Sequence, residues 1–324
     1  MTELPTFAIV ELNSQLPILP NLFAIEQGIQ QAVTLGASLV VLPENAFCFG
    51  QQAYAGRYFE PLKDWCAMAA RHYGIYLLAG TLPCPYRPDG TPVPAGKFRQ
   101  SSLLFDPAGD CLARYDKIHL FKATVNDSTG SYDESRTFEA GNQLVVAPTE
   151  FGNIGMMVCF DVRFAPLAIA LRQLGAQILT VPAAFTFQTG KAHWQALLRA
   201  RALDSQCMVV GAGQTGKHHI VRGNQTSHRM TWGHSQFVNA NGEVISKDPT
   251  ADTLPASSWA AKPLADQARH WVVSEDEPVL VTDPSSPSYR VISTQFDQVA
   301  QQQWRQNIAL MDCQKLTITH PFTR

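Results

Sequence analysis

The chain has 324 residues, of which 45% are hydrophobic and 16% are charged. That hydrophobic share supplies a sizeable core, and it excludes both a disordered chain and a small scaffold that depends on disulfides. The 25 basic residues nearly balance the 27 acidic ones, which leaves a formal net charge of −2. No global field of that size would hold nucleic acid or an anionic membrane, so we expect neither as a partner.

The cysteine pattern and the N-terminus favour a reducing, cytoplasmic compartment. The seven cysteines are odd in number and contain no CxxC pair, which argues against a disulfide framework and a structural zinc site. Residues 1–6 show no basic stretch followed by an apolar run, so we expect no signal peptide. No apolar stretch approaches the roughly 20 residues that a membrane span needs.

Apolar runs alternate with helical patterns along most of the chain. In chain order, they predict a strand at 7–12, a helix at 21–35, a strand at 38–42, a helix at 61–73 and a strand at 75–79. A helix at 165–174, a strand at 178–181, a helix at 191–205 and a strand at 208–211 follow. Strands and helices in alternation predict an α/β sandwich in which helices cover sheets.

Two long stretches break this alternation. Residues 122–141 are polar and predict a loop over a site. Residues 248–289 contain six prolines and predict a loop-rich excursion before a last strand at 291–294. The glutamine-rich tail at 296–310 has a helical apolar pattern.

Three reactive side chains lie just past the ends of apolar strands, where open α/β folds commonly carry function. They are Glu44 in VVLPEN, Lys117 in RYDKIHLF and Cys159 in GMMVCFDVRF. Singly, they read as a solvated loop carboxylate, a surface lysine and a small core residue. Together they supply what acyl transfer needs: a thiol, a base that makes the thiolate, and a cation that meets the oxyanion.

The surrounding segments resemble the nitrilase superfamily of carbon–nitrogen hydrolases, which use a Glu-Lys-Cys triad. The resemblance runs from about residue 7 to 247 and resumes near 289. It includes ESRTFEAGN (134–142), PAAFTFQTGKAHW (182–194), LLRARALDSQC (197–207) and GHSQFVNANGEVI (233–245). The most similar branch is that of the deaminated-glutathione amidases and omega-amidases. Within it, RARALDSQC, VVGAGQTGKHH and WGHS favour the deaminated-glutathione side.

The resemblance implies a four-layer α-β-β-α sandwich of the nitrilase type that forms a homodimer or a higher homo-oligomer. We interpret residues 1–324 as a single carbon–nitrogen hydrolase domain, with an insertion at about 248–289 and a C-terminal extension at about 296–324. Relatives usually pass almost directly from the strand at GEVI to the last strand, so the insertion departs from the family. It either covers the active site, extends the dimer contact or decorates the surface.

The resemblance also implies a mechanism and a fourth catalytic residue. By motif position that residue is Glu134, a second carboxylate that would hold Lys117 and tune Glu44; the alternative is an ordinary surface glutamate in a loop. Glu44 would take the proton of Cys159, and the thiolate would attack an amide carbonyl. Lys117 and the backbone N–H of Phe160 would stabilise the oxyanion, and the reaction would need no metal and no cofactor.

The residues after Cys159 indicate which kind of substrate to expect. Phe160-Asp161 stands where true nitrilases of the superfamily usually carry Trp-Glu, which favours an amide over a nitrile. In the resembling branch Arg163 clamps a substrate carboxylate, a task that suits its planar guanidinium. The alternative for Arg163 is a structural ion pair with Asp161.

Two more positions match the pocket of that branch. They are Phe185 and Thr189 in AFTFQTG. The alternatives are core packing for Phe185 and an N-cap of the following helix for Thr189.

We therefore expect hydrolysis of a primary amide in a small carboxylate-bearing substrate, above all deaminated glutathione, through a cysteine thioester with release of ammonia. An omega-amidase acting on 2-oxoglutaramate is the alternative, followed by an N-carbamoyl amine hydrolase and an inactive nitrilase-like scaffold. Slow turnover of nitriles stays open. A papain-type protease fits poorly, because Cys159 ends a strand where papain's cysteine begins a helix.

Four histidines lie within a short span, at positions 218, 219, 228 and 234. They invite a metal hypothesis. Adjacent histidines on a strand point to opposite faces, and no HxxxH spacing or cysteine partner is present. We therefore expect no metal site.

Overall fold

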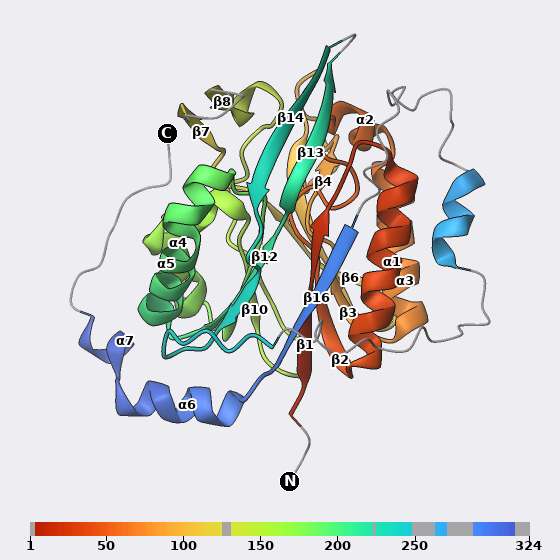
Figure 1. The fold of residues 1–324 in the computed structure, drawn as a ribbon. Coiled ribbons are helices and arrows are strands. Elements are labelled where there is room, and N and C mark those ends of the chain that lie inside the picture. Colours follow the sequence, from red (N-terminus) through yellow and green to blue (C-terminus); the bar gives the residue numbers. More distant parts are fainter. Residues whose placement is uncertain (1–3, 125–130, 223–224, 248–262, 271–287, 315–324) are drawn as a thin grey trace.

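A computed structural model describes residues 4–124, 131–222, 225–247, 263–270 and 288–314. Two sheets lie in the middle, and Figure 1 shows helices α1 and α3 on one outer side and α4 and α5 on the other. This arrangement confirms the four-layer α-β-β-α sandwich. None of the described helices combines the length and the apolar character needed to cross a bilayer.

The first sheet has seven strands in the order β16-β1-β2-β3-β5-β4, with β6 also paired to β5. Strands β1, β2 and β3 run parallel, whereas β16 is antiparallel to β1. The strands are β1 (Thr6–Asn13), β2 (Ala37–Val41), β3 (Tyr76–Leu78), β4 (Leu82–Cys84), β5 (Arg99–Phe105), β6 (Cys111–Asp116) and β16 (Ser288–Gln295). The helices on this side are α1 (Ile18–Thr34), α2 (Gln52–Arg57) and α3 (Phe59–Tyr73).

The second sheet has five strands in the order β15-β12-β11-β10-β9. Its three central strands are parallel, as the alternation with helices predicted. The strands are β9 (Val146–Ala147), β10 (Ile154–Met156), β11 (Ile178–Ala183), β12 (Met208–Gly213) and β15 (Gln236–Val238). Helices α4 (Ala165–Gln173) and α5 (Phe187–Ser205) belong to this half of the molecule.

Strand β1 packs against the layers on both sides of its sheet. Ala8, Val10 and Leu12 pack in the cluster that holds α1 and α3, whereas Phe7 and Ile9 pack in the cluster that holds the second sheet. Successive side chains of a strand point to opposite faces, so this continuous apolar run is buried on both sides.

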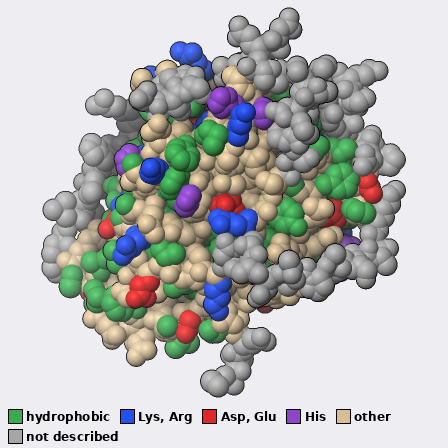
Figure 2. All heavy atoms as spheres, in the orientation of Figure 1, with side chains coloured by type: hydrophobic (Ala, Val, Ile, Leu, Met, Phe, Trp, Pro, Cys, Tyr) green, Lys and Arg blue, Asp and Glu red, His purple; other side chains and the backbone are tan. Residues whose placement is uncertain are grey.

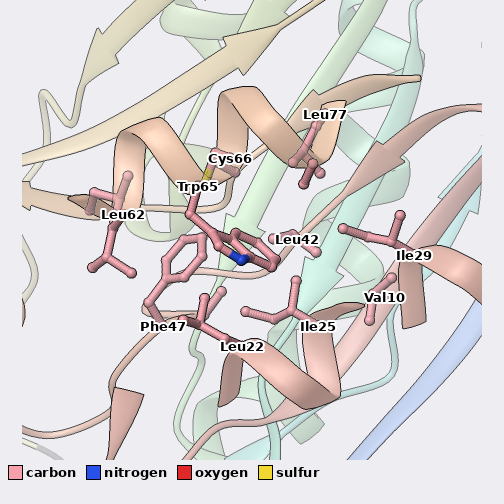
Figure 3. Close-up of a cluster of buried hydrophobic side chains, with 14 of the residues drawn as sticks. Val10, Leu22, Ile25, Ile29, Leu42, Phe47, Leu62, Trp65, Cys66 and Leu77 are labelled. Atoms are coloured by element: carbon pink, nitrogen blue, oxygen red, sulfur yellow. The ribbon is translucent and has the colours of Figure 1, made fainter. Parts of the chain in front are cut away.

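The core between the first sheet and its helices is centred on Trp65, which is fully buried. Its ring lies edge-on to Phe47 with the centroids 6.3 Å apart. Figure 3 shows Leu22 and Ile25 of α1, together with Leu42, closing around the two rings. Truncating such a buried aromatic side chain costs about 3–5 kcal/mol, so this cluster is a main source of stability.

Several elements differ from the sequence-based predictions. Helix α5 begins at Phe187, four residues before the predicted start at 191, and the predicted loop at 122–141 contains β7 (Lys122–Thr124), β8 (Ser131–Asp133) and the short 3-10 helix η1 (Glu134–Arg136). The long hairpin of β13 (Thr215–Arg222) and β14 (Gln225–Trp232) was not predicted. Figure 1 shows this hairpin rising beyond the sheets at one end of the molecule.

The described part of the insertion is the 3-10 helix η4 (Leu264–His270), the light blue helix beside α1 in Figure 1. The backbone N–H groups of Leu264 and Ala265 donate to the buried carboxylate of Glu26 in α1, each at 2.7 Å. This segment therefore rests on the outer helices. The remaining positions of the predicted insertion, 248–262 and 271–287, lie outside the described residues.

The C-terminal extension forms α6 (Gln298–Asn307) and α7 (Leu310–Cys313). Gln301 accepts a hydrogen bond from the N–H of Met208 and donates to the carbonyl of Gln177, and the guanidinium of Arg305 donates to the carbonyl of Gln206. These contacts fasten α6 to the second sheet. On the described part of the face in Figure 2, lysine and arginine side chains are scattered among uncharged ones.

Candidate active site

Lys117 is the centre of the charged cluster. It follows strand β6 directly, and its side chain is fully buried. Its Nζ donates to Glu44 Oε1 at 2.9 Å and to the two carboxylate oxygens of Glu134 at 2.8 and 3.1 Å. Burial alone would lower the pKa of Lys117, but the charges of Glu134 and Glu44 outweigh it and raise that pKa well above its ordinary value. The ammonium form is therefore held firmly.

Glu44 lies in the turn after strand β2 and is 2% exposed. The turn packs against Gly80, where a Cβ would lie 2.0 Å from the carbonyl oxygen of Pro43, so only glycine fits there. The next residue, Asn45, adopts a left-handed conformation, and its side-chain oxygen accepts hydrogen bonds from Gln52 and Gln100. Oε1 of Glu44 accepts the hydrogen bond from Lys117, whereas Oε2 accepts no hydrogen bond from the described residues.

Cys159 begins the 3-10 helix η2 (Cys159–Arg163), whereas strand β10 already ends at Met156. The prediction that Cys159 ends a strand is therefore wrong. Its φ of 48° is left-handed, a conformation that costs a non-glycine residue about 1–3 kcal/mol. Asp161 secures the bend, because its fully buried carboxylate accepts from the N–H of Val158 at 2.9 Å and from the hydroxyl of Tyr115 at 2.7 Å. It also accepts from the N–H of His119 at 3.0 Å, which connects the cysteine segment to the lysine segment.

The electrostatics keep the thiol protonated in the free enzyme. Burial raises the pKa of Cys159 well above its ordinary value, and the charge of Glu44 raises it further against the opposing charge of Lys117. A thiol in this state becomes a nucleophile only when a base removes its proton. Glu44 lines the same cavity and is the carboxylate with an available oxygen.

Glu134 approaches Lys117 from the opposite side and belongs to η1. Burial raises the pKa of Glu134, and the ammonium of Lys117 opposes that rise. Its Oε2 also accepts from the N–H of Phe121 at 2.8 Å, which fixes the carboxylate in place. The position predicted from the motif is thus a direct partner of the lysine and not an isolated surface glutamate.

Arg163 has no carboxylate partner among the described residues. Asp161, the alternative considered from the sequence, is occupied by Val158, Tyr115 and His119. The guanidinium instead lies over the ring of Phe185 at 5.2 Å and beside His193 at 3.3 Å. An arginine held by ring faces in this way keeps donors available for an anion.

Cys159, Glu44, Glu134 and Arg163 line one cavity of about 360 Å³, called the inner cavity below. Thr189 lies on its wall and shares a hydrogen bond of 2.8 Å with the hydroxyl of Thr186, so the N-cap alternative for Thr189 is wrong because α5 starts earlier. Phe185 packs on Trp194 with ring centroids 5.0 Å apart and also faces the cavity. The lining residues are Glu44, Asn45, Phe121, Glu134, Cys159, Phe160, Arg163, Ala184, Phe185, Thr186, Thr189 and Arg229.

Sequence reasoning missed the part of this wall that the β13–β14 hairpin contributes. The N–H of Trp232 donates to the carbonyl of Phe185, and Gly190 of α5 leaves room for the Trp232 ring. This docking brings Arg229 to the cavity, where its Nη2 donates to the carbonyl of Ala184 at 2.7 Å. The signal for Arg229 lies in tertiary contacts and not in a motif.

The histidines have other partners. The buried ring of His218 lies between the carbonyl of Ser14 at 2.7 Å and the hydroxyl of Thr231 at 2.6 Å, and burial lowers its pKa to about 3. His234 stacks on Trp232 with the ring centroids 3.9 Å apart. Among the described residues, no group of three or more His, Cys, Asp or Glu side chains is arranged to hold a metal ion.

The fold and the site define a class of protein. A thiol, two carboxylates and an ammonium group meet in a sandwich of two sheets and are the groups that cysteine-dependent acyl transfer requires. The model of the carbon–nitrogen hydrolase family matches residues 6–254. The chain belongs to the carbon–nitrogen hydrolase family, and it is a hydrolase of amides other than peptides.

Curated relatives give a finer comparison. The chain is 42% identical over 251 residues to the deaminated glutathione amidase of Yersinia enterocolitica. The matched region covers 75% of this chain and 82% of the relative. It is 37% identical over 250 residues to the enzyme of the same name from Synechocystis, covering 74% and 85%. Human omega-amidase NIT2 is 35% identical over 246 residues, covering 74% and 82%.

Solved structures support the fold. The NitFhit protein of C. elegans matches with a TM-score of 0.73 and 25% identity over 96% of this chain, and this chain spans 65% of that protein. Nit3 of Saccharomyces cerevisiae, described as a member of branch 10 of the nitrilase superfamily, matches with a TM-score of 0.70 and 22% identity, covering 96% and 97%.

Proposed function

We propose that this enzyme hydrolyses the amide of a 2-oxo acid derivative, deaminated glutathione above all, through a thioester on Cys159. The observation that carries the proposal is the inner cavity, where Cys159 and Glu44 lie together with the guanidinium of Arg163, which pairs with no carboxylate among the described residues. The names of the curated relatives support the substrate class.

The reaction begins with proton transfer. Glu44 Oε2 takes the proton of Cys159, and the sulfur attacks the amide carbonyl carbon. The ammonium of Lys117 and the N–H of Phe160 stabilise the tetrahedral oxyanion, because they are fixed donors in a largely water-excluded site. Glu44 then gives the proton to the departing nitrogen, so the carbon–nitrogen bond breaks and the thioester remains.

The second half restores the thiol. Glu44 removes a proton from a water molecule, which attacks the thioester carbonyl. The acid leaves, and the sulfur recovers its proton. Glu134 holds Lys117 between two carboxylates throughout, so the charge that faces the oxyanion stays in place.

Arg163 selects the acyl group in this proposal. Its donors would grip the carboxylate of a 2-oxo acid while the ring faces of Phe160 and Phe185 hold the guanidinium. Deaminated glutathione and 2-oxoglutaramate share the 2-oxoglutaryl group and differ in what leaves. Ammonia leaves from 2-oxoglutaramate, whereas the amide of deaminated glutathione is secondary and releases cysteinylglycine. The expectation of a primary amide and of ammonia release therefore fits 2-oxoglutaramate and is wrong for deaminated glutathione.

The principal test compares the two substrates. We expect the purified enzyme to release 2-oxoglutarate from both, with cysteinylglycine from one and ammonia from the other, and Cys159→Ala to release none. An N-carbamoyl substrate would also yield carbon dioxide, which separates that alternative. Product formation by Cys159→Ala at a tenth of the wild-type rate would remove Cys159 from its role.

A prediction for Arg163 follows from its lack of a carboxylate partner. Arg163→Gln should lower kcat/KM for 2-oxoglutaramate by about 10- to 100-fold, since a hydrogen-bonded charge pair is worth about 1.5–3 kcal/mol. Pentanamide, which has no carboxylate, should lose far less. An equal loss for both amides would show that Arg163 supports the structure and does not select the substrate.

The remaining proposals concern assembly and location. Helices α6 and α7 and the two residues between them expose the apolar side chains of Val299, Ile308 and Leu310, which supports a homo-oligomer. We expect at least a dimer by light scattering. A cytoplasmic location, a small molecule as the only substrate class, and no nucleic acid or membrane partner remain predictions from composition.

A further inference from the structure

A second, larger hollow opens beside the inner cavity. It has a volume of about 1450 Å³, is open to solvent, and is called the outer basin below. Asn45, Phe121, Glu134 and Arg229 line both spaces, so the two are adjacent. The inner cavity, at about 360 Å³, is the smaller of the two spaces. It suits a small acyl group, so a bulky leaving group must extend into the basin.

Arg229 lies at the junction of the two spaces and is held rigidly. Its guanidinium carbon lies 4.9 Å from the centre of the Tyr132 ring and 5.4 Å from that of Phe49. Its Nη2 donates to the carbonyl of Ala184, while its buried Nε donates to none of the described residues. Arginine carries five N–H donors, so most of its capacity remains.

No carboxylate among the described residues pairs with Arg229. The acidic side chains of the outer basin have other partners. Glu134 is bound to Lys117 at 2.8 Å, and Asp133 lies 3.7 Å from the ammonium of Lys122. Arg229 is thus a cation that no carboxylate of the described residues neutralises and that two aromatic rings align, which lowers the entropic cost of binding an anion.

The chain length of a substrate fits this position. Arg229 contacts the carbonyl of Ala184, and the backbone of the same residue approaches the sulfur of Cys159 as a hydrogen-bond donor. Arg229 and Cys159 also line the same inner cavity. A leaving group of two extended residues places its carboxylate about 7 Å from the cleaved amide, so a cation on the wall of this cavity is suited to meet it.

We propose that Arg229 binds a second carboxylate, carried by the leaving amine, and so selects substrates with an anionic group on each side of the cleaved amide. This inference rests on the proposed function. Arg163 holds the carboxylate of the acyl group, and Arg229 holds that of the leaving group. Deaminated glutathione carries both carboxylates, whereas 2-oxoglutaramate carries one.

The test couples the arginine to the substrate carboxylate. Deaminated glutathione is compared with its C-terminal carboxamide, which has the same size and one charge fewer. The wild-type enzyme should prefer the carboxylate form by about 10- to 100-fold in kcat/KM. In Arg229→Gln this preference should fall to about one. Because the readout is a ratio within one variant, general damage to the site cancels.

Arg136 provides a matched control. It lines the outer basin, is exposed, and is expected to contribute little because exposed ion pairs are worth little. Arg136→Gln should keep the wild-type preference. If Arg229→Gln fails to fold by thermal melting, Arg229→Lys replaces it and should retain only part of the preference, because lysine lacks the planar fork.

The outcomes are distinct. Hydrolysis of both forms at equal rates by the wild type, or an unchanged preference in Arg229→Gln, overturns the role of Arg229 and leaves the proposed function standing. Loss of the preference in Arg136→Gln alone moves the anion site to Arg136. If the wild type hydrolyses neither form of deaminated glutathione and does not hydrolyse 2-oxoglutaramate, the proposed function is overturned, and this inference with it.

Discussion

At the scale of single residues, Cys159 and Lys117 are buried groups that both have a raised pKa and keep their protons. The lysine is therefore charged, whereas the cysteine is neutral. The lysine is fully buried yet charged, because two carboxylates hold it. The cysteine has no such support, and burial raises the pKa of its thiol. The active site therefore contains a permanent cation and a neutral thiol. Glu44 Oε2 has to remove the proton of the thiol before the sulfur can attack.

The raised pKa predicts how the thiol reacts with a small thiol-specific disulfide reagent. Below the pKa of a thiol, the thiolate fraction rises tenfold per pH unit, so labelling of Cys159 should accelerate about tenfold per unit from pH 7 to pH 9 without a plateau. Peptide mass spectrometry measures the rate at which Cys159 is labelled. Labelling of the exposed Cys313 in the same sample is the control for the reactivity of the reagent. A rate that is already constant at pH 7 would mean a thiolate in the free enzyme.

At the scale of elements, Asp161 connects the cysteine segment to the lysine segment. Its carboxylate is the common acceptor for donors from the residue before η2, from β6 and from the residues after β6. Asp161→Asn would turn an amide toward these donors, and each unsatisfied donor costs about 1–3 kcal/mol. We expect a loss of that order in the free energy of unfolding, and a fall in kcat larger than any change in KM.

Tyr115→Phe serves as the control for that experiment. It removes one hydrogen bond to Asp161 and the acceptor of the Ile118 N–H, and it leaves the other donors to Asp161 in place, so it should cost about 1.5–3 kcal/mol and preserve kcat. Urea denaturation and steady-state kinetics measure both variants. A normal kcat in Asp161→Asn would show that this connection supports stability alone.

Another element-scale prediction concerns the insertion. Glu26 accepts the N–H groups of Leu264 and Ala265 and the hydroxyl of Tyr73. Glu26→Ala should lower the free energy of unfolding by about 1–3 kcal/mol and speed proteolysis within 263–270. No described residue of η4 lines the inner cavity, so kcat/KM per folded molecule should stay the same. A changed kcat/KM would connect the insertion to catalysis.

The predictability of the structure differed between elements for physical reasons. The parallel strands were foreseen because burial on both faces demands continuous apolar runs, as in residues 38–42. Glu44, Lys117 and Cys159 stood out because short motifs carry them. The β13–β14 hairpin alternates polar and apolar side chains weakly, and its docking through Trp232 is long-range. Arg229 and the carbonyl of Ala184 could therefore not be placed from the sequence.

At the scale of the whole molecule, His218 makes stability depend on pH. Its pKa falls from 6.5 to about 3 on folding, so below pH 6.5 the unfolded chain binds a proton that the folded chain does not. Stability from this group is complete above pH 6.5 and is lost as the pH falls toward 3. Between pH 7 and pH 5 the loss is about 2 kcal/mol.

The measurement compares unfolding at those two pH values in the wild type and in His218→Gln. The variant is less stable overall because Ser14 and Thr231 lose their partner, but it should lose about 2 kcal/mol less between pH 7 and pH 5. Parallel curves for the two proteins would contradict a buried neutral imidazole.

The pairing of the last described strand with the first has a consequence for synthesis on the ribosome. Strand β1 lies between β2 and β16, and β16 is completed only at Gln295. Until nearly the whole polypeptide has been translated, one edge of β1 has open N–H and C=O groups that invite pairing with other chains. Final closure of this sheet therefore waits for residues 288–295, and a nascent chain stalled before residue 288 would be a candidate for chaperone capture.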